Sequence, residues 1–161
     1  MLFRRMIVGV LALAPAMPAS AHGPVHAMSG GKLGDPARVS RTVEVVAIEN
    51  AFSLKSLQVR DGETVRFVVR NDGMDPHELI IGTTAEHTAH RMMMREMMEA
   101  QKRGQPHSMA AMEHTSGVWV EPGKSASFVW AFARTPNLEF ACNIPGHYED
   151  GMHGPITFVP Q

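Results

Sequence analysis

The chain has 161 residues, and 15 Lys and Arg against 16 Asp and Glu give a formal net charge of −1. This balance excludes a general electrostatic attraction to nucleic acid or to anionic lipid. The single Cys excludes an internal disulfide, an all-cysteine zinc site and an iron–sulfur cluster held by cysteines alone. The 13 Met and 9 His are unusual in so short a chain, and both side chains bind soft or borderline metal ions.

Residues 1–21 are typical of a secretory signal peptide. The basic pair Arg4-Arg5 precedes an apolar run over residues 6–17, and Ala19-Ser20-Ala21 matches the small-x-small cleavage pattern. The alternative is a membrane anchor, but the apolar run is too short to span a bilayer. We therefore expect a periplasmic protein that is not inserted in the membrane after cleavage.

Residues 22–40 are rich in Gly, Pro and Ala and have no periodicity, which predicts a flexible leader. Cleavage after residue 21 leaves His22 at the N-terminus, where its amine and ring together can chelate copper, and His26 follows nearby. These two residues are candidate auxiliary copper ligands. The alternative is an ordinary frayed terminus.

The body of the chain, residues 41–161, is predicted to form one β domain. Two β-rich runs flank the turn pair Asp61-Gly62, which predicts a hairpin. Short apolar or alternating runs separated by turn residues favour a Greek-key β-sandwich or barrel over a parallel sheet. The predicted strands are 42–48, 57–60, 64–69, 78–81, 118–120, 125–132, 138–142 and 156–159.

Residues 85–116 interrupt this pattern as a Met- and His-rich insertion. Residues 85–103 contain neither Gly nor Pro and are dense in helix formers, so they predict a helix that ends before Gly104 and Pro106. Three roles stay open for its Met-rich face: packing on the sheet, additional Cu(I) sites, or partner recognition. The candidate auxiliary ligands here are His87, His90, Met93, Met94, Met97 and Met98.

A metal-binding pattern lies near the C-terminus. Cys142, His147 and Met152 are separated by four residues each, and a second imidazole is available from His77, which follows Asp75-Pro76. Two His and one Cys with a distant thioether form the blue-copper ligand set. Zinc is disfavoured because a thioether is a poor zinc ligand. A Cys–His nucleophile is also disfavoured, since the sequence offers no clear oxyanion-hole loop or orienting partner.

These motifs resemble the cupredoxin family over residues 42–159. The resemblance rests on the segment 71–78 and on the loop 142–152, whose spacing is similar to that of rusticyanin. It is closer to bacterial periplasmic cupredoxin-like proteins that have a Met-rich insertion, a Pro122-Gly123 turn before a Trp-containing strand, and the same loop pattern. The resemblance implies a Greek-key β-sandwich with one type 1 copper ligated by His77, Cys142, His147 and Met152.

The chain departs from the plastocyanin-like pattern at one position. Glu78 follows the first His ligand, where that pattern usually has an Asn that helps to tie the ligand loops together. Groups beyond the ligands tune a copper site. The colour and the reduction potential therefore do not follow from the resemblance.

The expected function is a monomeric copper protein that cycles between Cu(I) and Cu(II) and has a role in copper homeostasis or tolerance. The alternative is a dedicated electron carrier between redox partners. A multicopper oxidase or nitrite reductase is disfavoured because the sequence lacks His-x-His pairs and a second copper domain. We therefore expect a protein that is not an enzyme, does not bind nucleic acid, and has a redox or copper-handling protein as its partner.

Overall fold

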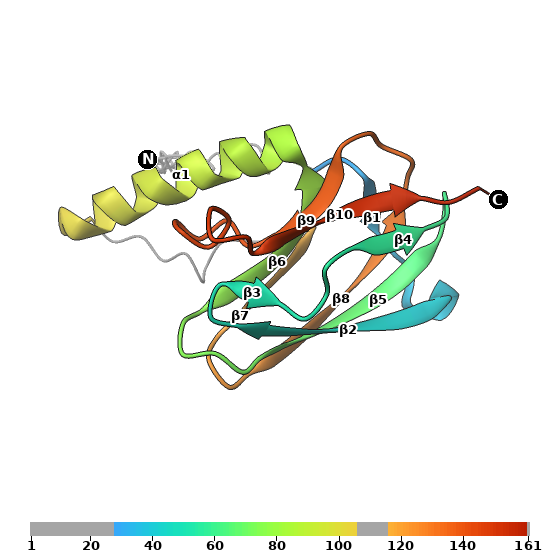
Figure 1. Ribbon diagram of the computed structural model, residues 1–161, viewed down its shortest axis with the longest axis horizontal. Coiled ribbons are helices and arrows are strands. Elements are labelled where there is room, and N and C mark those ends of the chain that lie inside the picture. The colour runs from blue at the N-terminus through green and yellow to red at the C-terminus, as the bar shows by residue number, and fades with distance from the viewer. Residues whose placement is uncertain (1–27, 106–115, 161) are drawn as a thin grey trace, which may run out of the picture.

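Two five-stranded sheets face each other in a computed structural model that describes residues 28–105 and 116–160 (Figure 1). The first sheet has the order β1 (Gly31–Leu33), β8 (Ser125–Phe132), β5 (Thr64–Asn71), β2 (Arg41–Ile48) and β3 (Ala51–Phe52). The second has the order β4 (Leu57–Val59), β10 (His153–Phe158), β9 (Leu138–Ala141), β6 (His77–Thr83) and β7 (Gly117–Val120). This arrangement confirms the predicted β-sandwich.

The predicted hairpin around Asp61-Gly62 is wrong. β4 pairs in parallel with β10, whereas β5 pairs in parallel with β2 and antiparallel with β8, so the two strands belong to different sheets. Gly62 has a φ of +78°, which fits a tight turn. The turn pair was correctly placed, but here the turn carries the chain from one sheet to the other.

Part of the segment predicted as a flexible leader, residues 22–40, is a strand of the first sheet. β1 pairs antiparallel with β8, and the indole Nε1–H of Trp130 donates to the Gly30 carbonyl at 3.1 Å. Asp35 then caps a short 3₁₀ helix, η1 (Pro36–Arg38). Residues 22–27, the signal peptide of residues 1–21, and the candidate ligands His22 and His26 lie outside the described residues.

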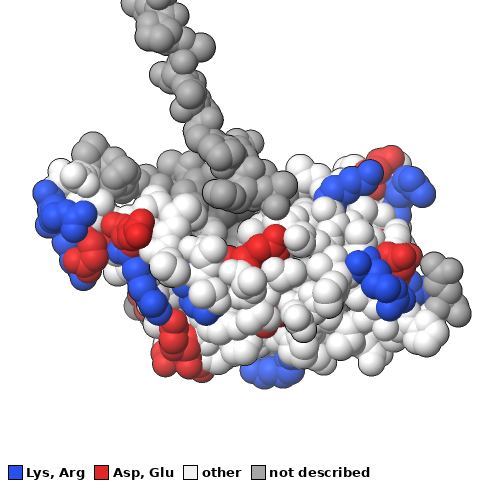
Figure 2. Space-filling view, turned by 90° about the horizontal axis from the view of Figure 1, so that it is seen from above, with Lys and Arg blue, Asp and Glu red and all other residues white. Residues whose placement is uncertain are grey.

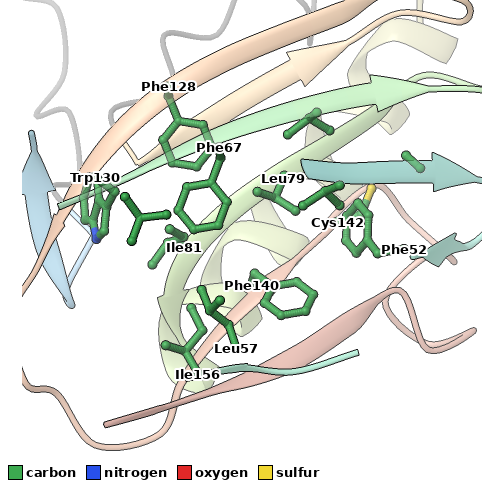
Figure 3. Packing of buried hydrophobic residues seen from close by; sticks show 14 of the residues in the cluster. Phe52, Leu57, Phe67, Leu79, Ile81, Phe128, Trp130, Phe140, Cys142 and Ile156 are labelled. Atoms are coloured by element: carbon green, nitrogen blue, oxygen red, sulfur yellow. The ribbon is translucent and has the colours of Figure 1, made fainter. Parts of the chain in front are cut away.

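The hydrophobic core lies between the two sheets (Figure 3). Phe67 stacks on Phe128 with ring centroids 5.0 Å apart, and Phe52 meets Phe140 edge to face at 5.9 Å. Cys142 belongs to the same buried cluster and lies next to Phe52 in Figure 3. The thiol is therefore held at the edge of a packed core, where its surroundings are rigid.

The one α-helix among the described residues, α1 (Thr84–Lys102), follows β6 and runs along the outer side of the second sheet (Figure 1). It confirms the predicted helix over 85–103 to within one residue at each end. Thr83 and Glu86 form a capping box at its start, which satisfies amide groups that have no partner within the helix. Within residues 28–105 and 116–160, no helix is both long and apolar enough to cross a membrane.

Charges of both signs are mixed at the C-terminal end of α1 in the face shown by Figure 2. On α1, Lys102 pairs with Glu99 at 2.8 Å, and Arg95 pairs with Glu149 of the β9–β10 loop at 2.5 Å. Because positive and negative groups are interspersed, this end of the helix does not form a single-sign patch. The mixture agrees with the net charge of −1.

Candidate metal centre

Three of the four predicted ligands meet in one buried cluster. The Nδ1 atoms of His77 and His147 are 3.2 Å apart, and the Cys142 Sγ lies 3.4 Å from the His147 Nδ1. One ligand atom from each residue lies within 4.8 Å of the others. Among the described residues, this is the one group of three or more His, Cys, Asp or Glu with such a separation.

Strand periodicity explains why these side chains meet. Alternate residues of a strand point to opposite faces, so His77 shares a face with Leu79 and Ile81, which belong to the core. At the end of β9, Cys142 continues the inward-facing series that includes Phe140. Because β6 and β9 are paired, with Ile80 opposite Ala141, both ligands enter the same end of the sandwich.

The loop between β9 and β10 brings His147 and Met152 back to Cys142. The Met152 amide donates to the His147 carbonyl at 2.9 Å, and the Cys142 amide donates to the Met152 carbonyl at 3.0 Å. Gly146 and Gly151 each have a φ of +98°, which favours glycine, and each immediately precedes a predicted ligand. The Met152 side chain is fully buried, and Met152 belongs to the same buried cluster as Cys142.

The electrostatics of this cluster suit a soft cation. Burial lowers the pKa of His77, and the charge of His147 lowers it further. Burial also lowers the pKa of His147, and both shifts favour neutral rings whose lone pairs are available to a cation. Burial and the nearby Glu78 raise the pKa of the Cys142 thiol to about 12, so a bound cation must displace its proton. Neutral imidazoles, a thiol and a thioether together fit copper better than magnesium, calcium or zinc.

Glu78 links the two ligand-bearing segments, as the Asn of the plastocyanin-like pattern is expected to do at the same position. Its Oε1 accepts one hydrogen bond from the Asn143 amide and a second from the Asn143 side chain, both at 2.8 Å. Glu78 follows His77, and Asn143 follows Cys142. The carboxylate therefore joins the two ligand-bearing strands directly behind the cluster.

Asn71 shapes the turn that precedes His77. Its side chain donates to the carbonyls of Asp75 at 2.8 Å and Val120 at 3.0 Å, and it accepts from the Gly73 amide at 2.9 Å. The residue is fully buried at the end of β5. These bonds tie the turn to β7 and fix where β6 begins.

The candidate auxiliary ligands on α1 are spread over different environments. His87 is fully buried, with Nδ1 3.0 Å from the Asn143 Oδ1 and Nε2 3.3 Å from the Glu139 carbonyl. The Nε2 of His90 lies 3.3 Å from Glu78. Met94 is fully buried, and the remaining three candidates are half-buried: Met93, Met97 and Met98.

The comparisons with known proteins agree with this geometry. Residues 39–159 match the family model described as copper binding proteins, plastocyanin/azurin family. The chain belongs to this family. It is a cupredoxin, and cupredoxins bind copper.

Two relatives cover nearly the whole of this cupredoxin. It is 39% identical to the copper-resistant cuproprotein CopI of Pseudomonas aeruginosa, over 96% of this chain and 94% of the relative. It is 40% identical to the protein of the same name from Rubrivivax gelatinosus, over 86% of this chain and 81% of the relative.

Solved structures show the same fold. Auracyanin B has a TM-score of 0.62 at 22% identity, covering 82% of this chain and 97% of auracyanin B. An azurin from Methylomonas sp. strain J has a TM-score of 0.54 at 15% identity, covering 76% of this chain and all of the azurin. These similarities support the sandwich architecture.

Sequence reasoning identified the four candidate ligands but not the groups behind them. The sequence pattern gives Asn143 no role, and it marks His87 as a candidate auxiliary copper ligand. A weak signal was available, because Glu78 and Asn143 each follow a predicted ligand and must therefore point to the opposite face. The partner of Asn143 on the helix is 56 residues away, so no local pattern could reveal it.

Proposed function

We propose that this cupredoxin is an exported, monomeric type 1 copper protein of copper tolerance, with His77, Cys142, His147 and Met152 as ligands. The observation that carries the proposal is the convergence of two imidazoles and the lone thiol in one buried cluster. The buried Met152, tied by main-chain hydrogen bonds to both Cys142 and His147, supports its place as the thioether ligand.

Copper, when bound, supplies one-electron chemistry between Cu(I) and Cu(II). Thiolate and thioether ligands suit Cu(I), while imidazole suits both oxidation states. The chain contributes a site whose donors are fixed by two paired strands and by a loop closed with main-chain hydrogen bonds. Such a site changes little between oxidation states, and this favours rapid electron exchange.

A role in copper tolerance is supported by relatives that cover most of the chain and are named copper-resistant cuproproteins. A vibrio relative with the same name is 36% identical over 85% of this chain. The signal-peptide pattern in residues 1–21 supports a periplasmic location, where a copper-handling protein is the expected partner. The auxiliary ligands on α1 and at residues 22 and 26 stay a prediction.

An electron carrier is the second candidate, and one observation favours it. His147 is 8% exposed, whereas His77, Cys142 and Met152 are each fully buried. The half-buried Ile144 and Pro145 precede it in the same loop. The edge of this imidazole is therefore the shortest route from the cluster to a docked redox protein.

The decisive experiment measures copper stoichiometry and the visible spectrum of the mature protein. We expect one type 1 copper with an intense thiolate-to-copper absorption, which Cys142→Ser abolishes and the exposed-residue control Met92→Leu retains. Retention of the band by Cys142→Ser contradicts the ligand assignment. In a strain lacking this protein, the wild type but not Cys142→Ser should restore growth on copper. Normal growth on copper without the protein, together with impaired respiration, supports the electron carrier instead.

A further inference from the structure

Helix α1 covers the face of the second sheet that points away from the core. On β6, this outer face carries Glu78 and Gly82, which alternate with the inward-facing residues. On β9 and just beyond it, the outer face carries Glu139 and Asn143. The inserted helix therefore lies over the reverse side of the two segments that provide His77 and Cys142.

A buried hydrogen-bonded chain crosses from the helix to this reverse side. The Oε1 of Glu78 accepts a hydrogen bond from the Asn143 main-chain amide. The Asn143 side chain also contacts this oxygen, and it must do so with its NH₂ group, because only that end of the side chain can donate. The Asn143 Oδ1 then faces the His87 Nδ1 at 3.0 Å. His87 must therefore carry a proton on Nδ1 and donate it to Asn143.

The three side chains of this hydrogen-bonded chain are buried, which fixes their hydrogen-bond partners. The exposed fractions of His87, Glu78 and Asn143 are all 0%, so water has little access to replace a missing partner. A buried polar atom that loses its partner costs about 1–3 kcal/mol. The Asn143 amide is therefore held in a single orientation, with one end fixed by β6 and the other by α1.

We propose that His87 is a positioning residue of the metal centre. Through its Nδ1–H bond to Asn143, it fixes the residue that follows Cys142 and so sets the direction of the thiol. The Met- and His-rich insertion is then a structural part of the copper site. This inference rests on the proposed ligand set, and it assigns His87 a role other than binding copper.

Two substitutions test the contacts of the two His87 ring nitrogens separately. In His87→Asn, the Nδ2 occupies the place of the ring Nδ1 and can still donate to Asn143. In His87→Gln, the Nε2 reaches toward the Glu139 carbonyl instead, and the bond to Asn143 is lost. Met94→Ala is the matched control, because Met94 is equally buried on the same helix but contributes none of the hydrogen bonds to Asn143. The copper-loaded full-length mature protein is used throughout.

The measurements are the thiolate-to-copper absorption, the reduction potential and the Cu(II) affinity. We expect His87→Gln to shift the band and the potential and to lower copper affinity by roughly tenfold. His87→Asn should keep the wild-type band, and Met94→Ala should lower the melting temperature without shifting the band.

A wild-type band and affinity in folded His87→Gln overturn the proposal. So do equal shifts in all three variants, because they indicate a general loss of stability. If the wild-type protein itself lacks the intense band, the proposed ligand set has failed, which is a separate result. If His87→Gln does not fold, His87→Ala carries the same test, since it removes the donor to Asn143 and leaves the Asn143–Glu78 hydrogen bonds in place.

Discussion

The carboxylate of Glu78 accepts two hydrogen bonds from Asn143, one from its amide and one from its side chain, and both measure 2.8 Å. Each partner directly follows a candidate ligand, so the pair joins the β6 ligand to the β9–β10 loop. A negative charge at this position favours the more positively charged state of a nearby metal ion.

Glu78→Gln should raise the reduction potential of the copper site. The amide oxygen of Gln can still accept from Asn143, while the charge is lost. With an effective dielectric constant typical of proteins, the change is on the order of 2 kcal/mol, or about 90 mV for one electron. Cyclic voltammetry of the copper-loaded variant measures it. An unchanged potential contradicts a charged Glu78.

Asn71→Ala should destabilise the turn that carries His77. The substitution removes three hydrogen bonds, two of them buried, and leaves main-chain groups without partners, so we expect a loss of about 2–4 kcal/mol in unfolding free energy. Urea unfolding of the metal-free protein measures this loss. The neighbouring Asp72 forms an exposed pair with Arg70, and Asp72→Ala should leave the unfolding free energy nearly unchanged. Equal losses in the two variants contradict the assigned role of Asn71.

Glu86 should make the stability of the helix start depend on pH. Burial raises the pKa of Glu86, but hydrogen bonds from Thr83 and Ser29 outweigh burial and hold the pKa below its usual value. The stabilisation is therefore complete above the unfolded-state pKa and is lost as pH falls through the lower folded-state pKa. Glu86→Gln should cost about 0.5–1 kcal/mol at pH 7, and its difference from wild type should disappear in acid.

Unfolding curves of both proteins over a series of pH values test this expectation. A difference that is constant with pH contradicts a contribution from the carboxylate charge. Thr83→Ala serves as a comparison because it removes the other half of the capping box, and its cost should persist in acid.

Gly31→Ala should detach β1 from β8. A Cβ at this position would lie 2.1 Å from the Ala131 carbonyl oxygen, which is main chain and cannot move aside easily. We expect a loss of roughly 1–3 kcal/mol, because the strand pairing and the adjacent Trp130 hydrogen bond are disturbed. Tryptophan fluorescence during unfolding measures it. Lys32→Ala, an exposed change in the same strand, should be neutral, and comparable losses in both variants contradict the steric explanation.

The sequence was sufficient to predict that His77, Cys142 and His147 meet, because Cys142 and His147 lie close together in the chain and all three side chains are chemically distinctive. It was also sufficient for α1, whose composition and stop residues are local signals. It failed at Asp61-Gly62, since a turn pair predicts a change of direction but not which sheet the next strand joins. It failed at β1 because a Gly-rich strand gains its stability from pairing with β8, nearly 100 residues later.

The pairing of β6 with β9 has a consequence for how the protein acquires its metal. In an unfolded chain, Cys142, His147 and Met152 are close together in sequence, but His77 is far away. The second imidazole arrives only when Ile80 and Ala141 come into register. Binding by the full set of candidate ligands therefore requires the paired strands, since a polypeptide that has not completed its sheet can offer only an incomplete set of donors.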